Sequence, residues 1–109
     1  MFKPIEEFLD NPEVLALIPG LYSMEGQEVD DHLLLLRFFH PLSKCAWYAV
    51  EYDPTDRVFF GWTDGDFQEW GYFSLLEMAF AGFKGVPVMW DVDFKPIRFV
   101  DWKAGVREV

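Results

Sequence analysis

The hydrophobic positions of this chain change their spacing near residue 32, which separates a helical beginning from a strand-rich middle. In the beginning, the Asn-Pro-Glu at 11–13 is typical of a helix start, because asparagine caps helices well and proline fits the first helical position. The apolar spacing predicts a helix over Pro12–Ile18, which Pro19-Gly20 ends. The segment Phe2–Leu9 fits one or two further helical turns.

Apolar segments separated by short turns follow, and they predict an antiparallel meander. The first segment, Leu33–His40, has apolar residues at both odd and even positions, which is typical of a central strand covered on both faces. The second segment, Cys45–Tyr52, has side chains that alternate between two faces, which places Trp47 and Glu51 on the same face. The connections are too short for crossovers, so consecutive strands are expected to pair. The predicted strands are Leu33–His40, Cys45–Tyr52, Val58–Trp62 and Phe67–Phe73.

A second helix is predicted after the meander. Ser74 and Glu77 have the spacing of a capping box, and the helix is expected to run to about Ala81, before Gly82. Val88–Asp93 fits a short edge strand. We therefore expect an α+β fold in a single domain over residues 1–109: an antiparallel meander of about four strands with the N-terminal and post-meander helices packed on it.

Composition and charge narrow the class of protein. The chain is 51% hydrophobic and contains 12 Phe, 5 Trp and 4 Tyr, which excludes a disordered chain. Its net charge is -10, and the acidic residues concentrate in residues 1–31 (-7) and 51–69 (-5). Such a chain repels nucleic acid and anionic membranes, so neither is expected as a direct partner. A partner recognised electrostatically should be basic.

Cysteine and histidine content predicts no disulfide, metal or cofactor. Cys45 is the only cysteine, and no Cys/His spacing of a zinc site is present. The N-terminus has no basic segment followed by an apolar run, and no segment has the roughly 20 apolar residues of a membrane span. These features favour a cytoplasmic protein.

Several short elements of the chain form a recognisable set. They are Leu21–Gln27 (LYSMEGQ), Arg37–Phe39 (RFF), Trp47–Asp53 (WYAVEYD), Phe59–Gly61 (FFG), Glu69–Leu75 (EWGYFSL) with Glu77, Gly85–Pro87 with Asp91, and Phe94–Pro96 (FKP). Together they resemble a small bacterial family that is catalogued only as a domain of unknown function, number twenty-nine fifty-eight. The resemblance spans roughly residues 12–97, and Trp70 and the acid-rich N-terminus depart from it. The resemblance implies a short protein often encoded on plasmids, phages and other mobile elements, a setting that favours defence or counter-defence roles. It implies no activity.

Aromatic and acidic residues on the strands and turns are the candidate binding residues. A sheet with helices on one side leaves aromatic side chains exposed, and apolar rings rimmed by carboxylates are typical of a protein-binding surface. Ordinary core packing and solvated turns explain the same residues without a binding role. The candidates are Trp47, Glu51, Asp53, Trp62, Asp64, Asp66 and Trp70.

The leading hypothesis is a non-enzymatic module that binds another protein, which includes a mimic of the DNA phosphate backbone that occupies a basic groove. A homodimer through apolar sheet faces is a further expectation. The alternative is a small carboxylate-dependent hydrolase that uses Glu51 or Asp53 with His40. His40 and Cys45 could also meet across a turn as a nucleophile pair. Glu51, on an apolar face, needs a partner such as Arg37.

Overall fold

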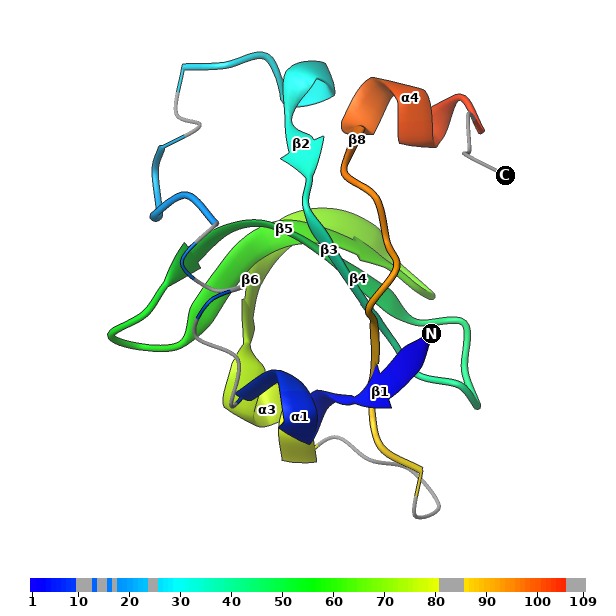
Figure 1. The fold of residues 1–109 in the computed structure, drawn as a ribbon. Coiled ribbons are helices and arrows are strands. Elements are labelled where there is room, and N and C mark those ends of the chain that lie inside the picture. Colours follow the sequence, from blue (N-terminus) through cyan, green and yellow to red (C-terminus); the bar gives the residue numbers. More distant parts are fainter. Residues whose placement is uncertain (10–12, 14–15, 17, 24–25, 81–85, 106–109) are drawn as a thin grey trace.

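The computed structural model is dominated by one antiparallel sheet. It describes residues 1–9, 13, 16, 18–23, 26–80 and 86–105. The sheet has six strands in the order β1-β7-β3-β4-β5-β6, and a separate pair is formed by β2 and β8 (Figure 1). The strands are β1 (Phe2–Pro4), β2 (Leu33–Leu34), β3 (Leu36–Phe39), β4 (Ala46–Asp53), β5 (Val58–Asp64), β6 (Gln68–Ser74), β7 (Met89–Asp91) and β8 (Ile97–Arg98). The helices are α1 (Ile5–Leu9), η1 (Val29–Asp31, a 3-10 turn), α3 (Leu75–Phe80) and α4 (Phe99–Lys103).

Strands β3 to β6 pair consecutively, as the spacing of the apolar segments predicts. β4 and β5 pair from Ala46 opposite Asp64 to Asp53 opposite Val58, and β5 continues onto β6 along its whole length. The predicted bounds of the second, third and fourth strands agree with the structure to within two residues. Short polar turns make these hairpins local, so sequence spacing suffices to predict them.

The sheet curves strongly, so that both of its outer strands, β1 and β6, lead to the end of the molecule where α1 and α3 lie (Figure 1). α1 follows β1 directly, α3 follows β6 directly, and the two helices contact each other across the opening between those strands. The inside of the curve holds the larger hydrophobic core. Its buried members are Ile5, Phe8, Phe38, Ala49, Tyr52, Phe59, Phe73, Met78, Val88 and Trp90.

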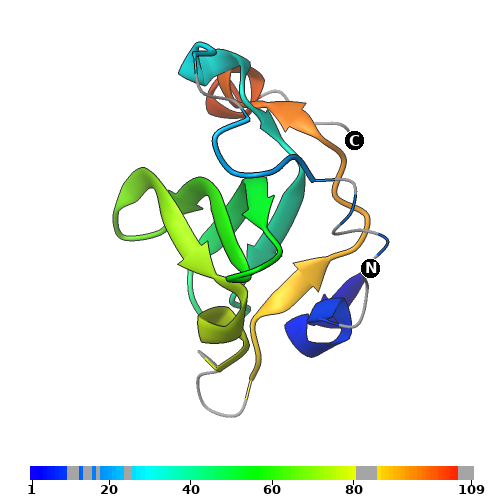
Figure 2. The same cartoon turned by 90° about the vertical axis from the view of Figure 1, so that its left-hand side faces the viewer.

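A second, smaller core lies on the outer face of the sheet. β2, β8 and α4 lie at the end of the molecule opposite α1 and α3, in both views (Figures 1 and 2). The ring of Phe99 on α4 lies 4.6 Å from that of Trp62 and 4.8 Å from that of Trp70. The buried members of this core are Leu34, Ala46, Tyr48, Val50 and Phe99. The C-terminal segment therefore covers aromatic residues of the sheet.

The expected α+β class is wrong, because the structure is mostly β. The helices are short, with five residues in α1, six in α3 and five in α4. They do not form a layer on a meander, since the curved sheet encloses its own core and α1 and α3 fill its opening. Helix propensity and capping indicate where a helix starts, but not whether it will cover a sheet. In the described part of the chain, no helix has the length and apolar character needed to cross a membrane.

Two predicted elements need correction, and a third cannot be compared with the structure. The single strand predicted for Leu33–His40 is two strands in different sheets, since β2 pairs with β8 and β3 pairs with β4 and β7. The predicted edge strand near Val88–Asp93 is an interior strand, because Phe2–Pro4 adds outside it as β1 and is not helical. The helix predicted for Pro12–Ile18 lies mostly outside the described residues. Long-range strand pairing, which local spacing does not encode, determined the structure of Leu33–His40 and Val88–Asp93.

The start of α3 agrees with the capping box. The backbone N–H of Glu77 donates to the Ser74 hydroxyl at 3.3 Å, and the helix begins at Leu75. An N-cap hydroxyl of this kind satisfies one of the N–H groups that the first helical turn leaves unpaired.

Burial of Tyr52 predicts a loss of stability at high pH. Burial raises the pKa of the Tyr52 hydroxyl above its usual 10.0, the Arg57 cation opposes the rise, and the Asp53 carboxylate adds to it. The unfolded chain therefore ionises Tyr52 at a lower pH than the folded protein does. This contribution is fully present below about pH 10 and is lost as the pH rises through the folded pKa.

We expect the free energy of unfolding of the wild type to fall more steeply above about pH 10 than that of Tyr52→Phe. Urea unfolding of both proteins at a series of alkaline pH values measures this difference. Lysine titration affects both proteins alike, so it cancels in the comparison. Equal slopes would show that Tyr52 ionises as readily in the folded protein as in the unfolded chain.

Candidate functional site

A pocket on the outer face of the sheet is built around Glu51. A bulge between Ala49 and Glu51 shifts the register of β4, so Glu51 lies opposite Phe60, and Phe60 lies opposite Tyr72 on β6. Residues directly opposite each other share a face of a sheet, so these three side chains form one row across three strands. Without the bulge, Glu51 would point into the main core with Ala49. The bulge therefore creates the acidic floor of the pocket.

The segment 19–23 is fastened to β4 at this point. The backbone N–H of Tyr22 donates to Oε1 of Glu51 at 3.1 Å, and the N–H of Tyr52 donates to the carbonyl of Pro19 at 2.9 Å. Tyr22 has a φ of 68°, a left-handed conformation that is uncommon for a bulky residue. Glu51 thus has a structural role, since it holds the wall of its own pocket in an unfavourable backbone conformation.

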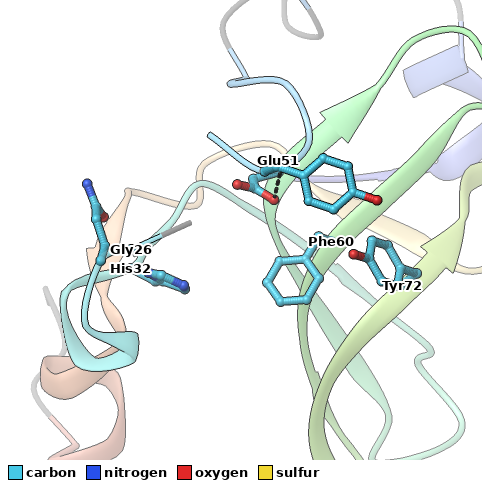
Figure 3. A pocket seen from close by; sticks show the side chains of 7 residues that line it. Gly26, His32, Glu51, Phe60 and Tyr72 are labelled. Atoms are coloured by element: carbon cyan, nitrogen blue, oxygen red, sulfur yellow. Dashed lines mark hydrogen bonds between the residues drawn. The ribbon is translucent and has the colours of Figure 1, made fainter. Parts of the chain in front are cut away.

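His32 forms the opposite wall of the pocket. It follows η1, its carbonyl accepts from the N–H of Phe99, and its ring meets Trp70 edge-on at 5.3 Å. The side chain is buried, with 7% exposure, and its Nδ1 has no hydrogen-bond partner in the described structure. Figure 3 shows Glu51, Phe60 and Tyr72 on one side of the pocket and His32 facing them from the other.

The pocket has a volume of about 330 Å³. Glu51 is only 4% exposed, whereas Tyr72 is 58% and Tyr22 64% exposed, so the carboxylate lies deep and the tyrosines lie near the mouth. The lining contains one carboxylate, one imidazole and three aromatic rings, and it contains no lysine or arginine among its described members. Those members are Tyr22, Gly26, Gln27, His32, Glu51, Phe60 and Tyr72. A site of this composition suits a small cationic or hydrogen-bond-donating group.

A family model described as a protein of unknown function (DUF2958) matches residues 11–105. The chain belongs to this family. No curated protein and no solved structure matches the chain. The membership confirms the resemblance seen in the sequence, but the family description names no activity. The function therefore has to be inferred from the site.

Four of the segments through which the sequence resembles this family contribute residues to the pocket. Leu21–Gln27 supplies Tyr22, Gly26 and Gln27, and Trp47–Asp53 supplies Glu51. Phe60 and Tyr72 belong to two further segments of the resemblance. Residues distant in the sequence thus form one site, and its buried carboxylate and its histidine nitrogen, unpartnered within the described structure, make it the candidate functional site.

The three tryptophans proposed as binding residues do not share a surface. Trp47 lies opposite Thr63 and packs against the main core inside the curve. Trp62 and Trp70 lie opposite each other on the outer face, where they pack on the second core beneath α4. All three are half-buried. Their packing accounts for them as core residues, and Phe60 with Tyr72 extends the outer aromatic row to the pocket.

The predicted acidic residues lie at two ends of the sheet. Asp53 ends β4 and accepts from the N–H of Thr55 at 2.9 Å, as in an Asx turn. Asp64 ends β5, at the other end of that hairpin, and accepts from the side-chain amide of Gln68 at 2.8 Å. Asp66 is exposed in the following turn. Only Glu51, of the four predicted carboxylates, lines the pocket.

The catalytic pair considered from the sequence is not brought together. His40 follows β3, and its backbone N–H bonds to Cys45 just before β4, whereas Glu51 lies six residues beyond Cys45 on that extended strand. A strand rises about 3.3 Å per residue, so His40 and Glu51 are on the order of 20 Å apart along β4. The histidine that does face Glu51 is His32. No grouping of three His, Cys, Asp or Glu residues suited to a metal ion occurs in the described ranges.

Sequence reasoning also missed the neighbours of Glu51. Arg37, its expected partner, pairs with Asp91 at 3.3 Å. Tyr22, His32, Phe60 and Tyr72 were not among the named site residues, although all but His32 lie in the segments of the family resemblance. The bulge at Val50 explains the error, because a single inserted residue moves every following side chain to the other face.

Proposed function

We propose that this protein is a non-enzymatic binding module that engages a basic protein partner through the pocket at Glu51. The observation that carries the proposal is the position of the Glu51 carboxylate, which is 4% exposed and forms the floor of a small pocket walled by aromatic rings. A carboxylate in such a site favours a cationic group over an anionic or neutral one.

The charge of the whole chain supports a basic partner. With a net charge of -10, the protein attracts cationic surfaces over the distance that salt leaves unscreened and repels nucleic acid. Several acidic side chains are paired within the protein, for example Asp30 with Lys103 and Asp91 with Arg37. The proposed setting is the cytoplasm, in keeping with the single free cysteine.

The DNA-mimic version of this proposal, which includes a counter-defence role, uses the turn carboxylates in place of the pocket. Asp53 and Asp64 lie at opposite ends of the β4–β5 hairpin, so a groove-shaped partner would have to span both ends. That version predicts that neutralising Asp64 and Asp66 together weakens binding as much as neutralising Glu51. The pocket version predicts that Glu51 dominates.

The test is affinity capture from a lysate of the source organism with the wild type, Glu51→Gln and Glu69→Gln, with identification of bound proteins by mass spectrometry. Both variants lose one negative charge, but Glu69 lies opposite Thr63 on the other face of the sheet from the pocket. We expect a basic protein that Glu51→Gln loses at least tenfold and Glu69→Gln retains. Equal recovery with all three proteins would contradict a role for the pocket.

A further inference from the structure

We infer that the pocket at Glu51 accepts a single arginine side chain, whose guanidinium pairs with the Glu51 carboxylate and stacks against the ring of Phe60 or Tyr72. This inference rests on the proposed function, because it names the group that the basic partner would insert. It also stands on the chemistry of the lining residues, which small probe molecules can test alone.

The carboxylate supplies the first contact. A guanidinium presents its N–H groups in a planar fork that matches the two oxygens of a carboxylate, whereas a lysine ammonium acts as a point charge. The N–H of Tyr22 donates to Oε1 of Glu51 and so orients the carboxylate. A carboxylate offers roughly four lone-pair positions, so it can accept from several donors at once.

The aromatic rings supply the second contact. Phe60 and Tyr72 lie side by side, with ring centres 5.2 Å apart, next to Glu51 in the same row of the sheet (Figure 3). A guanidinium stacks on such rings and is attracted by their π-electrons. Tyr72 and Tyr22 are more than half exposed, so both can close on a side chain that enters from solvent.

The protein already holds one of its own arginines in this way. The Cζ atom of Arg37 lies 4.4 Å above the ring of Phe39, and its guanidinium pairs with Asp91. One carboxylate and one aromatic ring from neighbouring strands therefore suffice to hold an arginine side chain on this sheet. The row of Glu51, Phe60 and Tyr72 repeats that combination around a pocket.

His32 supplies a second acceptor. Its ring is part of the pocket wall, and its buried Nδ1 has no hydrogen-bond partner in the described structure. A neutral imidazole carrying its proton on Nε2 accepts at Nδ1. A guanidinium has five N–H donors, so one ligand can meet Glu51 with some of them and His32 with another. A ligand without donors would leave this nitrogen unsatisfied.

The size of the pocket selects a side chain over a larger ligand. Its volume of about 330 Å³ is near the lower limit of pockets that hold drug-sized molecules, which is roughly 300 Å³. The absence of lysine and arginine from the described lining, together with the net charge of -10, disfavours nucleotides and other phosphorylated ligands. A base that lacks phosphate remains a competitor that the experiment can detect.

The experiment is a titration of the ¹⁵N-labelled protein, followed by two-dimensional NMR, with N-acetyl-arginine methylamide. Matched probes are the lysine analogue, the neutral citrulline analogue, which keeps the shape of arginine, and guanosine, a nucleoside without phosphate. We expect binding of the arginine probe in the range of about 1 mM, with shifts of the Tyr22, Glu51 and Phe60 amides. The lysine analogue should bind at least threefold more weakly and the citrulline analogue at least tenfold more weakly.

Variants place the probe in the pocket. Glu51→Gln should weaken the arginine probe at least tenfold, while Glu69→Gln should leave its affinity within a factor of two. Because Glu51 also holds Tyr22, Glu51→Gln is checked for folding by its NMR spectrum. If it does not fold, Tyr72→Ala decides the question, since this exposed ring is not needed for the core and its loss should weaken the probe at least threefold.

The inference is overturned if citrulline binds as well as arginine, if lysine or guanosine binds more tightly, or if the folded Glu51→Gln and Tyr72→Ala both bind like the wild type. It is separable from the proposed function. Capture of a partner that depends on Glu51, with no binding of the arginine probe, sinks this inference and leaves the function. Binding of the arginine probe without capture of such a partner supports this inference and contradicts the proposed function.

Discussion

Gly61→Ala is expected to destabilise the protein by about 3 kcal/mol, because the added methyl group has nowhere to go. A Cβ at Gly61 would lie 1.9 Å from the carbonyl oxygen of Tyr48 and 2.9 Å from its carbonyl carbon. These are backbone atoms of β4, so relief requires the β4–β5 pairing next to the bulge to open. A domain of this size has a free energy of unfolding of roughly 5–15 kcal/mol, so the loss is a large fraction of it.

Gly71→Ala is the matched control for this substitution. Gly71 lies directly opposite Gly61 on β6, and a Cβ there would meet no atom of the described residues within 4 Å. We expect the free energy of unfolding of Gly71→Ala to change by less than about 1 kcal/mol, since glycine in a strand interior has no side chain to pack and contributes little stability. Urea unfolding of both variants measures the contrast. Equal effects would mean that β4 approaches β5 less closely than the structure shows.

Phe59→Ala is expected to lower the free energy of unfolding by about 3–5 kcal/mol, the usual range for a phenylalanine removed from a packed core. Phe59 is fully buried, and its ring lies 4.6 Å from that of Tyr52, 5.4 Å from that of Phe73 and 5.6 Å from that of Phe38. It therefore joins strands β3 to β6 inside the curve, and its removal leaves a cavity among their side chains.

The adjacent residue provides the comparison. Phe60 points to the outer face and is half-buried beside the pocket, so Phe60→Ala should cost about 1 kcal/mol. Phe67 is 81% exposed in a turn, and Phe67→Ala should change stability by less than about 0.5 kcal/mol. Thermal and urea unfolding of the three variants test this order. A similar loss at Phe59 and Phe60 would contradict the assignment of the two faces.

The prediction for Gly61 and the binding proposal depend on the same region of β4. The close approach of Gly61 to Tyr48 lies immediately before the register shift, and the shift turns Glu51 toward Phe60 and Tyr72. We expect a protein with an altered bulge to lose both its stability and its acidic pocket. Conservative changes at Tyr72, by contrast, should affect binding and leave the fold intact.

The sequence by itself determined the local features. The turns between Cys45 and Ser74 predicted three paired strands in nearly correct positions, because short connections leave few alternatives to hairpins. The capping box predicted the start of α3, because it depends on residues within one helical turn. The net charge of -10 and the family resemblance could also be recognised from the sequence without a structure.

The tertiary structure alone decided the class of the fold and the site. Phe2–Pro4 becomes a strand because β7, more than eighty residues away, offers it an edge, and no local pattern encodes that pairing. Trp62 and Trp70 are covered because the C-terminal helix packs on them. Glu51 faces His32 because one bulge reverses the alternation of β4 and a distant turn brings His32 to the same face, whereas His40 lies beside the start of β4, six residues away along the strand. Each of these outcomes depends on contacts between segments far apart in the chain, and local propensity and periodicity carry no information about them.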